Sequence, residues 1–365
     1  MRLVWGTVSA IVSSAEGIQS LAVSLDDGEH GGALNYPSLA GSCAAGDRVL
    51  LNTTAVDLAL GTGGMHFVVA RMGEGAGVAL ADESGGHIMK LRYTPLQRDV
   101  LAVESPESPH HDVMAAAEDI AGTPVVCCGL HSHVPLVAAA AKAVDSSLRI
   151  AYCMTDQAAL PIALSDTVRE SRAVGLLDAT VTCGQAFGGQ FEAVNLHSGL
   201  LAARRVAGAD IVIVGIGPGV VGTTTLLGHG GIAQGEALNA VVALGGTPIA
   251  CLRVSFADTR DRHRVVSHHS LAALTRIALA PVTVAVPRIE PAQAEALDTA
   301  LEQAGVWDRH VRANGALGEV APDHRGVVVT TMRRGFTEDP AFFFAAYAAG
   351  EVAARMVRTP VTDKV

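Results

Sequence analysis

The segment 210–229 constrains the fold of this chain more than any other part of the sequence. Its β-branched run, residues 211–214, predicts a strand that is buried on both faces. A glycine-rich turn follows and leads through three consecutive threonines into a helix-like stretch that reaches Asn239. A strand, a glycine turn and a helix start together make a natural anion site, because the helix start offers free N–H groups and a positive dipole end. The turn contains Gly215, Gly217, Pro218, Gly219 and Gly222.

The spacing of these glycines does not identify a cofactor. Gly215, Gly217 and Gly222 depart from the G-x-G-x-x-G dinucleotide fingerprint, and no Gly-Lys-Ser/Thr sequence follows as it would in a P-loop. The sequence therefore does not favour NAD or ATP over other ligands, and the cofactor stays unknown. Two interpretations remain open, namely a tight turn that only packs a helix against a sheet, or ligand contact through Gly217, Gly219, Gly222 and Thr223.

Length and composition narrow the class of protein. The chain has 365 residues, enough for two domains, and although 49% of them are hydrophobic, every apolar run is interrupted before it reaches the ~18 residues of a membrane helix. A formal net charge of −10 argues against a nucleic-acid partner. The six cysteines form no CxxC pair and the N-terminus lacks a signal-peptide core, so we expect a cytoplasmic protein with reduced thiols. The apolar composition also allows a homodimer, without locating its interface.

Residues 1–104 predict a small all-β domain, either a barrel or a sandwich. Short runs rich in β-forming residues alternate there with turn residues. The runs are residues 3–12, 19–25, 48–52, 65–71 and 87–93.

Residues 105–365 predict an α/β domain with a mainly parallel, Rossmann-like open sheet that is flanked by helices. Apolar strand-like runs alternate with helical stretches, and such sheets bind ligands at the carboxyl ends of their strands. The predicted strands are 125–130, 150–154, 179–183, 211–214, 249–254, 282–286 and 327–331. The predicted helices are 136–144, 164–174, 192–206, 234–244, 270–279, 291–304 and 339–356.

A weak internal repeat lies at the centre of this domain. Glu192 and Asn195 recur as Glu236 and Asn239, and each pair follows a Gly/Gln segment. Residues three apart share one face of a helix, so one interpretation is a symmetric polar, ligand-binding pocket between two helix starts. The alternative is that the acids merely favour the positive ends of their helices.

Polar residues follow most of the predicted strands at the point where each strand ends. Because the strands of a parallel sheet end at one edge, we expect these loops to converge and to form a ligand site. Arg260 would bind a phosphate or carboxylate through bidentate hydrogen bonds, unless it is only a solvated loop residue. The candidates for acid–base catalysis, chosen because histidine and tuned carboxylates titrate near neutrality, are His131, His133, Asp156, Asp258 and His268. The other candidate ligand contacts are Gln185, Gly188 and Gly189.

The histidines also allow a metal site. The sequence His131-x-His133, the pair His268-His269 and the neighbouring aspartates supply the ligand chemistry that zinc and iron use. No H-E-x-x-H or comparable signature fixes the ligands, so the metal-binding residues stay unknown at this level.

Four segments of the chain form a set, namely residues 86–97, 184–195, 217–222 and 267–269. Together they resemble the bacterial domain-of-unknown-function 3866 family, and the likeness covers nearly the whole chain. The resemblance implies a bacterial cytosolic protein, and no catalytic residue can be transferred from it because the family carries no established activity. The family pattern often reads Gly-Thr-Gly-Thr after the turn, whereas here Gly222 precedes three threonines, which argues against a strict need for a second glycine.

Three functions fit these observations. The leading hypothesis is a protein that binds a small anionic metabolite, phosphorylated or nucleotide-like, at the carboxyl edge of its sheet, with or without catalysis. The second is a metal-dependent hydrolase that uses the histidine and aspartate loops. The third is a non-catalytic regulatory or scaffold protein whose β domain recruits a partner.

Overall fold

The computed structural model describes the chain apart from residues 60–62, 73–85, 87, 317–320 and 359–365. It divides the chain into two compact units, Met1–Val100 and Leu101–Val365. The predicted strand 87–93 begins outside the described residues, and the part within them forms β6 (Ile88–Lys90). No helix in the described segments combines the length and the apolar character that crossing a membrane requires.

The first unit contains a closed barrel, as the sequence predicted. The described strands follow the order β1-β2-β3-β5-β4 around it. Alternate residues point inward, so Val8, Leu21 and Val49 fill the interior. The barrel strands are β1 (Leu3–Ala15), β2 (Ile18–Leu25), β3 (His30–Asn35), β4 (Arg48–Asn52) and β5 (Met65–Met72). The same unit contains α1 (Pro37–Ala40), α2 (Thr54–Asp57) and a ribbon of β6 with β7 (Arg98–Val100).

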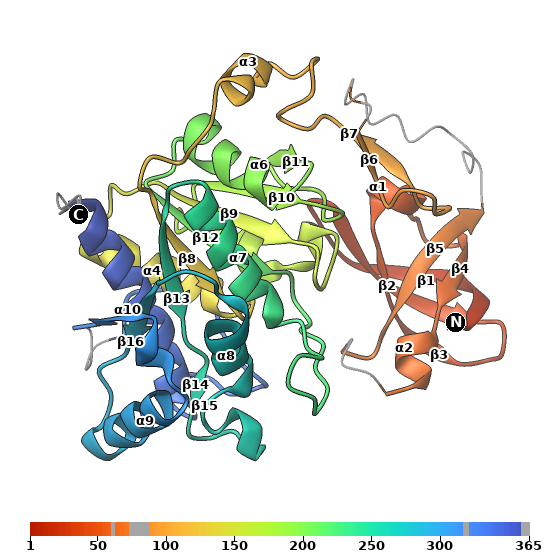
Figure 1. The fold of residues 1–365 in the computed structure, drawn as a ribbon. Coiled ribbons are helices and arrows are strands. Elements are labelled where there is room, and N and C mark those ends of the chain that lie inside the picture. Colours follow the sequence, from red (N-terminus) through yellow and green to blue (C-terminus); the bar gives the residue numbers. More distant parts are fainter. Residues whose placement is uncertain (60–62, 73–85, 87, 317–320, 359–365) are drawn as a thin grey trace. The chain divides into compact units, whose positions relative to one another are not determined.

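The second unit is built on a parallel sheet of eight described strands, which confirms the predicted α/β class (Figure 1). The strand order is β11-β10-β9-β12-β8-β13-β16-β17. Strand β12 lies between β9 and β8. The strands that follow β8 along the chain therefore lie on both sides of β8, with β9 to β12 on one side and β13, β16 and β17 on the other. The strands are β8 (Pro124–Cys128), β9 (Ile150–Thr155), β10 (Ala179–Cys183), β11 (Phe191–Ala193), β12 (Ile211–Ile216), β13 (Thr247–Cys251), β16 (Thr283–Val286) and β17 (Val311–Asn314).

Helices cover both faces of this sheet, and each face has its own core. Along β8, Val125 and Cys127 belong to one core, whereas Val126 and Cys128 belong to the other, because successive strand residues point to opposite faces. The core that contains Val126 and Cys128, called the second core, includes α4 (His133–Val144), α5 (Asp166–Ala173) and α10 (Pro340–Arg358). Helix α10 runs along α4 (Figure 1). The first core holds α6 (Leu196–Leu201), α7 (Ile232–Ala243), α8 (His268–Ala272) and α9 (Pro291–Gln303).

Short elements complete the second unit. Helix α3 (His111–Ala115) precedes the sheet, and a two-stranded ribbon of β14 (Val254–Ser255) and β15 (Val265–Val266) lies between β13 and α8. Helices α6 and α8 each continue as a π-helical turn, Ala202–Val206 and Ala273–Ile277. Single 3-10 turns lie at Ile162–Leu164, Asp261–His263 and Val306–Asp308.

Two predicted elements are wrong. Residues 327–331 form no strand, and β17 takes the last place in the sheet instead. Val327 and Val329 are buried against the core around α4 and α10, so the apolar alternation there reflects packing without strand pairing. The predicted helix 192–206 begins only at Leu196, because Phe191–Ala193 pairs with β10 as a strand. Glu192 and Asn195 therefore do not share a helix face.

The close contact between α4 and α10 depends on Gly350. A Cβ at this position would overlap the backbone carbonyl oxygen of Val137 and approach the Cβ of Ala140 to 3.0 Å. Alanine normally favours a helix over glycine by about 1 kcal/mol, but overpacking a core costs about 1–3 kcal/mol and a carbonyl cannot move aside as a side chain can. We expect Gly350→Ala to lower the free energy of unfolding, measured by urea denaturation. Stabilisation by the substitution would show that α10 does not lie this close to α4.

Candidate functional site

Three histidines from two separate segments meet beside the carboxyl edge of the sheet. His229 ends the long loop after β12, whereas His268 and His269 form the first turn of α8. One ligand atom from each lies within 4.8 Å of those of the other two. The rings of His229 and His269 stack with centroids 3.8 Å apart, and His268 meets both rings edge-on. We call His229, His268 and His269 the three-histidine cluster.

The ring nitrogens of the cluster are unusual because most of them lack a hydrogen-bond partner. Within the described residues, Nδ1 of His229, Nε2 of His268 and both ring nitrogens of His269 are buried and unpaired. Buried polar atoms in native proteins nearly always have a partner. The Nε2 of His229 lies 3.0 Å from the Leu226 carbonyl oxygen, to which it can donate its proton, so that Nδ1 keeps a free lone pair. A hydrogen bond of this kind orients histidines that bind metals.

The cluster is held in the neutral form. Burial and then the neighbouring His229 and His268 lower the pKa of His269 to about 2. Burial also lowers the pKa values of His229 and His268, in the latter case with a further contribution from His229. Next to them, burial and Arg253 lower the pKa of His263 to about 3. Neutral imidazoles with free lone pairs are the form of histidine that binds a metal ion.

The glycine-rich loop forms one wall of this cluster. A Cβ at Gly231 would lie 2.9 Å from the Cβ of His269 and 3.0 Å from Nδ1 of His229. A Cβ at Gly222 would lie 3.4 Å from the ring of His269. These glycines therefore let the backbone approach the imidazoles. The predicted helix 234–244 is confirmed as α7, which begins at Ile232. Thr223 lies in the loop before it and bonds to Thr225 and to the Gly228 carbonyl.

A buried charge network lies close to the histidines. The Asp258 carboxylate contacts Arg260 at 2.7 Å, Arg253 at 3.5 Å and Arg334 at 3.6 Å. Burial alone would raise the pKa of Asp258, but hydrogen bonds from Arg260 and the two nearest guanidinium charges hold it well below its usual range. Arg334 also bonds Asp339, which accepts the hydroxyl proton of Ser255 at 2.7 Å. Asp258 is thus ionised and ion-paired, a state that suits it to orient arginines rather than to transfer protons.

His131 lies in a separate hydrogen-bond network. Its ring contacts the Ser165 hydroxyl at 2.6 Å and both the Tyr152 hydroxyl and the Ile216 carbonyl oxygen at 3.2 Å. Burial lowers the pKa of His131 to about 4, although the bond to Ile216 raises it. Because Ser165 caps α5, His131 joins that helix to Tyr152 in β9 and to the end of β12.

The candidates after β9 and β10 form a third group, whose polar atoms bind one another. The Asp156 carboxylate accepts the Gln185 amide proton at 2.9 Å. Glu192 accepts the Gly188 amide at 2.6 Å and the Thr182 hydroxyl at 2.8 Å, and this hydroxyl accepts the Gly189 amide at 3.0 Å. Asn195 caps α6 through its side chain.

The second Glu–Asn pair does not mirror the first. Glu236 is exposed on α7. Asn239 donates to the Ile277 carbonyl at 2.9 Å and accepts from the Leu279 amide at 2.8 Å, so it fastens α7 to the turn that ends the π-helix. A symmetric pocket between two helix starts is therefore not formed.

His133 lies apart from the other predicted site residues. It is fully buried at the start of α4, and its ring stacks on Phe342 with centroids 4.6 Å apart. Cys128 and Cys251 are its neighbours. Burial raises the pKa of the Cys251 thiol, but its interactions with the neighbouring Cys128 and His133 outweigh that effect and lower this pKa to about 5.

Residues that the sequence analysis did not single out complete the candidate site. His229 was only the end of the glycine segment, Arg253 lay inside a predicted strand, and His263 was one polar residue of a long loop. Ser267, whose hydroxyl contacts Nδ1 of His263 at 2.7 Å and accepts the His269 amide, caps α8. The sequence signal that could have found them is the density of histidines in 229–269.

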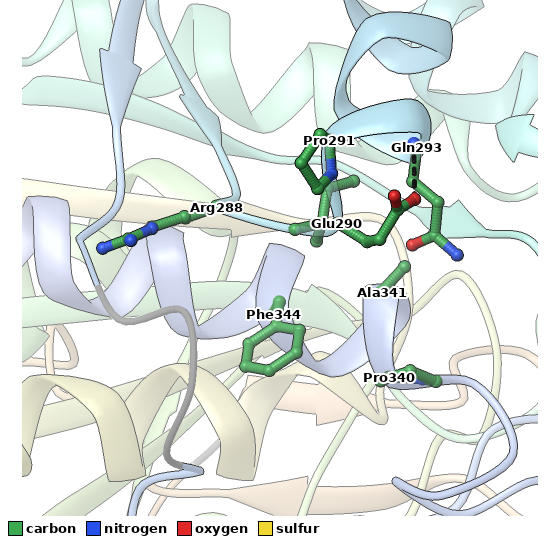
Figure 2. A pocket seen from close by; sticks show the side chains of 8 residues that line it. Arg288, Glu290, Pro291, Gln293, Pro340, Ala341 and Phe344 are labelled. Atoms are coloured by element: carbon green, nitrogen blue, oxygen red, sulfur yellow. Dashed lines mark hydrogen bonds between the residues drawn. The ribbon is translucent and has the colours of Figure 1, made fainter.

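A pocket of about 520 Å³ lies between the loop after β16 and the start of α10, and none of the predicted site residues lines it (Figure 2). Arg288, Glu290 and Phe344 are among its walls. The Glu290 carboxylate already accepts the Ala292 and Gln293 amides at the start of α9, so this helix end is occupied by the chain's own anion. The pocket therefore offers less to an anionic ligand than the histidine cluster with its arginines.

A family model described as "Protein of unknown function (DUF3866)" matches residues 32–350 of the chain. The searches of curated proteins and of solved structures found no match to this chain.

The buried position of Asp258 predicts a large effect of neutralising it. Removing one partner of a buried ion pair typically costs about 3–5 kcal/mol, because the remaining charge stays uncompensated. We expect Asp258→Asn to destabilise the protein by about that amount in urea denaturation, since its side chain is 2% exposed and that of Arg253 is 6% exposed. The control is Asp298→Asn, whose pair with Arg312 is exposed and should contribute less than about 1 kcal/mol. Equal effects of the two substitutions would contradict a buried network.

The depressed histidine pKa values predict acid sensitivity. Unfolded histidines bind protons below pH about 6.5, whereas the folded protein keeps His131 neutral down to pH about 4. The unfolded state then binds more protons. The free energy of unfolding therefore decreases as the pH is lowered through this window, by about 1.4 kcal/mol per pH unit for each such histidine. The measurement is urea denaturation between pH 7 and pH 4 with a chelator present. His131→Gln should reduce the slope, whereas His197→Gln, at an exposed position, should leave it unchanged.

Proposed function

The chain belongs to the DUF3866 family, and we propose that it is a metal-dependent hydrolase of a small anionic metabolite, phosphorylated or nucleotide-like. The proposal rests on one observation. His229, His268 and His269 bring buried, neutral and unpaired ring nitrogens within 4.8 Å of one another. A metal ion bound by all three would explain why these nitrogens lack other partners.

Three imidazoles suit zinc and similar divalent ions. Zinc sites with three protein ligands are typically catalytic, because the fourth position is left for water. The half-buried His268 and the exposed loop 221–228 leave the cluster within reach of small molecules. An ion bound there would supply an activated water for attack on an ester or phosphoester bond.

The arginines beside the cluster support an anionic substrate. Arg260 and Arg334 are partly exposed and are held by the buried Asp258. Guanidinium groups fixed in this way can bind phosphate or carboxylate oxygens, and their order reduces the entropy lost on binding. Arg253 is buried and lowers the pKa values of His263, His268 and His269, which places its charge close to the site.

The first test is metal binding. We expect one binding event for Zn²⁺ in calorimetry of the chelator-treated protein that disappears, or weakens by at least about 100-fold, in His269→Ala, since even indirect supports of a ligand are worth 10–100-fold. His197→Ala is the matched control because this histidine is exposed and lies outside the cluster. Unchanged Zn²⁺ binding in His269→Ala would exclude the three-histidine site.

The second measurement is hydrolysis of p-nitrophenyl phosphate by the zinc-loaded protein. Turnover should require the metal and should vanish in His269→Ala. Arg260→Ala should raise KM by about 10-fold or more, which corresponds to the loss of a charge-assisted hydrogen bond. Metal binding without turnover on a panel of phosphoesters and carboxylic esters would retain the metal site and reject the hydrolase.

A further inference from the structure

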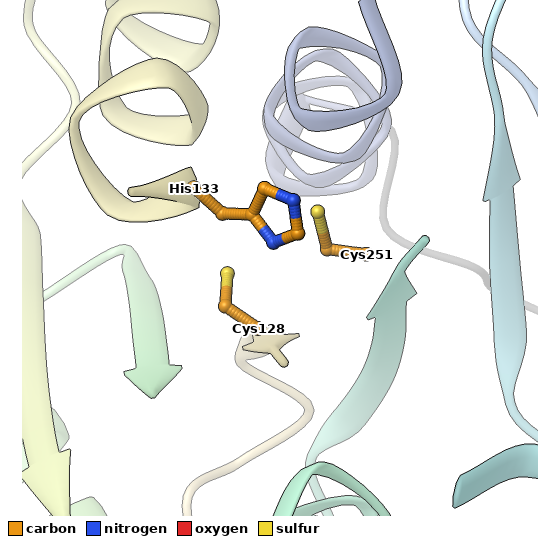
Figure 3. A group of neighbouring side chains, drawn as sticks. All are labelled: Cys128, His133 and Cys251. Carbon is orange, nitrogen blue, oxygen red and sulfur yellow. The ribbon is translucent and has the colours of Figure 1, made fainter. Parts of the chain in front are cut away.

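A second group of metal-binding side chains lies inside the core that contains α4 and α10. Cys128 ends β8 and Cys251 ends β13, and the two residues are directly paired across these neighbouring strands. His133 is the first residue of α4. Figure 3 shows its ring directed toward the two sulfur atoms, and a ligand atom from each residue lies within 4.8 Å of the other two.

The histidine of this group has no other use that the structure reveals. His133 is 0% exposed, and within the described residues neither of its ring nitrogens has a hydrogen-bond partner. Phe342 stacks on the ring and shields it without offering a polar contact. A buried imidazole with two unpaired nitrogens is costly to keep in an apolar core. This unpaired side chain, aimed at two thiols, is what indicates a ligand.

We propose that Cys128, His133 and Cys251 hold a thiophilic metal ion, either Zn²⁺ or Cu⁺, in a buried structural site. The donor set of two sulfurs and one imidazole is that of soft and borderline ions, whereas Mg²⁺ and Ca²⁺ require oxygen ligands. Two thiolates would balance the charge of Zn²⁺, which favours burial of that complex. Three donors without water access suit Cu⁺, because zinc in structural sites usually has four ligands.

This site is distinct from the three-histidine cluster and does not rest on the proposed hydrolase. All three donors are buried, so the ion would contact neither substrate nor solvent. It would connect β8, β13 and the start of α4, which are the elements from which the loops with His131 and Arg253 begin. Its role is therefore to brace the centre of the sheet.

Two other uses of these side chains fit less well. A disulfide between Cys128 and Cys251 would leave both ring nitrogens of His133 unpaired. A nucleophilic cysteine with a histidine base needs access to substrate, and none of the three residues is exposed beyond 2%. A bound ion is the one arrangement that engages all three side chains.

The test measures metal in the 365-residue chain, purified under reducing conditions and refolded anaerobically with Zn²⁺, with Cu⁺ or with neither. Native mass spectrometry counts the ions, and X-ray absorption identifies the ligand atoms. We expect one ion with two sulfur ligands, which X-ray absorption distinguishes from any ion held by the imidazoles of the three-histidine cluster. The spectrum of the unmodified protein needs no variant and therefore does not depend on whether a variant folds.

Cys251→Ser and Cys128→Ser should each lose this ion while His269→Ala keeps it. Cys127→Ser is the matched control, because Cys127 is equally buried on β8 but belongs to the opposite core. An ion count that is the same in Cys127→Ser and Cys251→Ser would overturn the proposal. Absence of any sulfur-ligated ion from the unmodified protein under both metals would overturn it as well.

Discussion

The parallel sheet that is buried on both faces is the constraint on which the rest of the α/β unit depends. Its strands end at one edge, so the loops after β8, β12 and β13 begin side by side although they are far apart in the sequence. Its side chains alternate between two cores, so the adjacent Cys127 and Cys128 face different helices. The three-histidine cluster depends on the first property, because its members come from loops at the sheet edge. The group of Cys128, His133 and Cys251 depends on the second, because these residues lie in one of the two cores.

The sequence predicted the centre of the sheet well and its edges poorly. Strands such as β8 and β12 are continuous apolar runs because neither face meets water. The edge strand β17 carries exposed residues, including Val311 and Arg312, and its pattern resembles a loop. Strand β3 was missed because the adjacent Gly31 and Gly32 interrupt its pattern. The pairing of β3 with β2 and β5 comes from the neighbouring strands, not from the local sequence.

The candidate sites were less predictable than the fold, because their members meet only through tertiary structure. The sequence predicts that the pair His268-His269 can bind a metal, but their third partner, His229, belongs to a loop after a different strand. The sequence predicts one loop chemistry for His131 and His133, but His131 lies partly buried in a hydrogen-bond network whereas His133 lies in a closed core. His131 lies in the loop and His133, two residues later, begins α4. Because the backbone changes from loop to helix between them, the two rings lie in different environments.

The glycine segment and the histidines depend on each other. A cluster of imidazoles can be packed at a 3.8 Å stacking distance only if the rings are neutral, and burial keeps them so. Burial in turn requires backbone close to the rings, which Gly222 and Gly231 permit. The nearby arginines would repel a cation as well as a protonated histidine, and Asp258 offsets part of that charge. Burial, more than the arginine charges, therefore keeps the ring nitrogens unprotonated, and the divalent ion proposed above would depend on Asp258 to offset the nearby guanidinium groups.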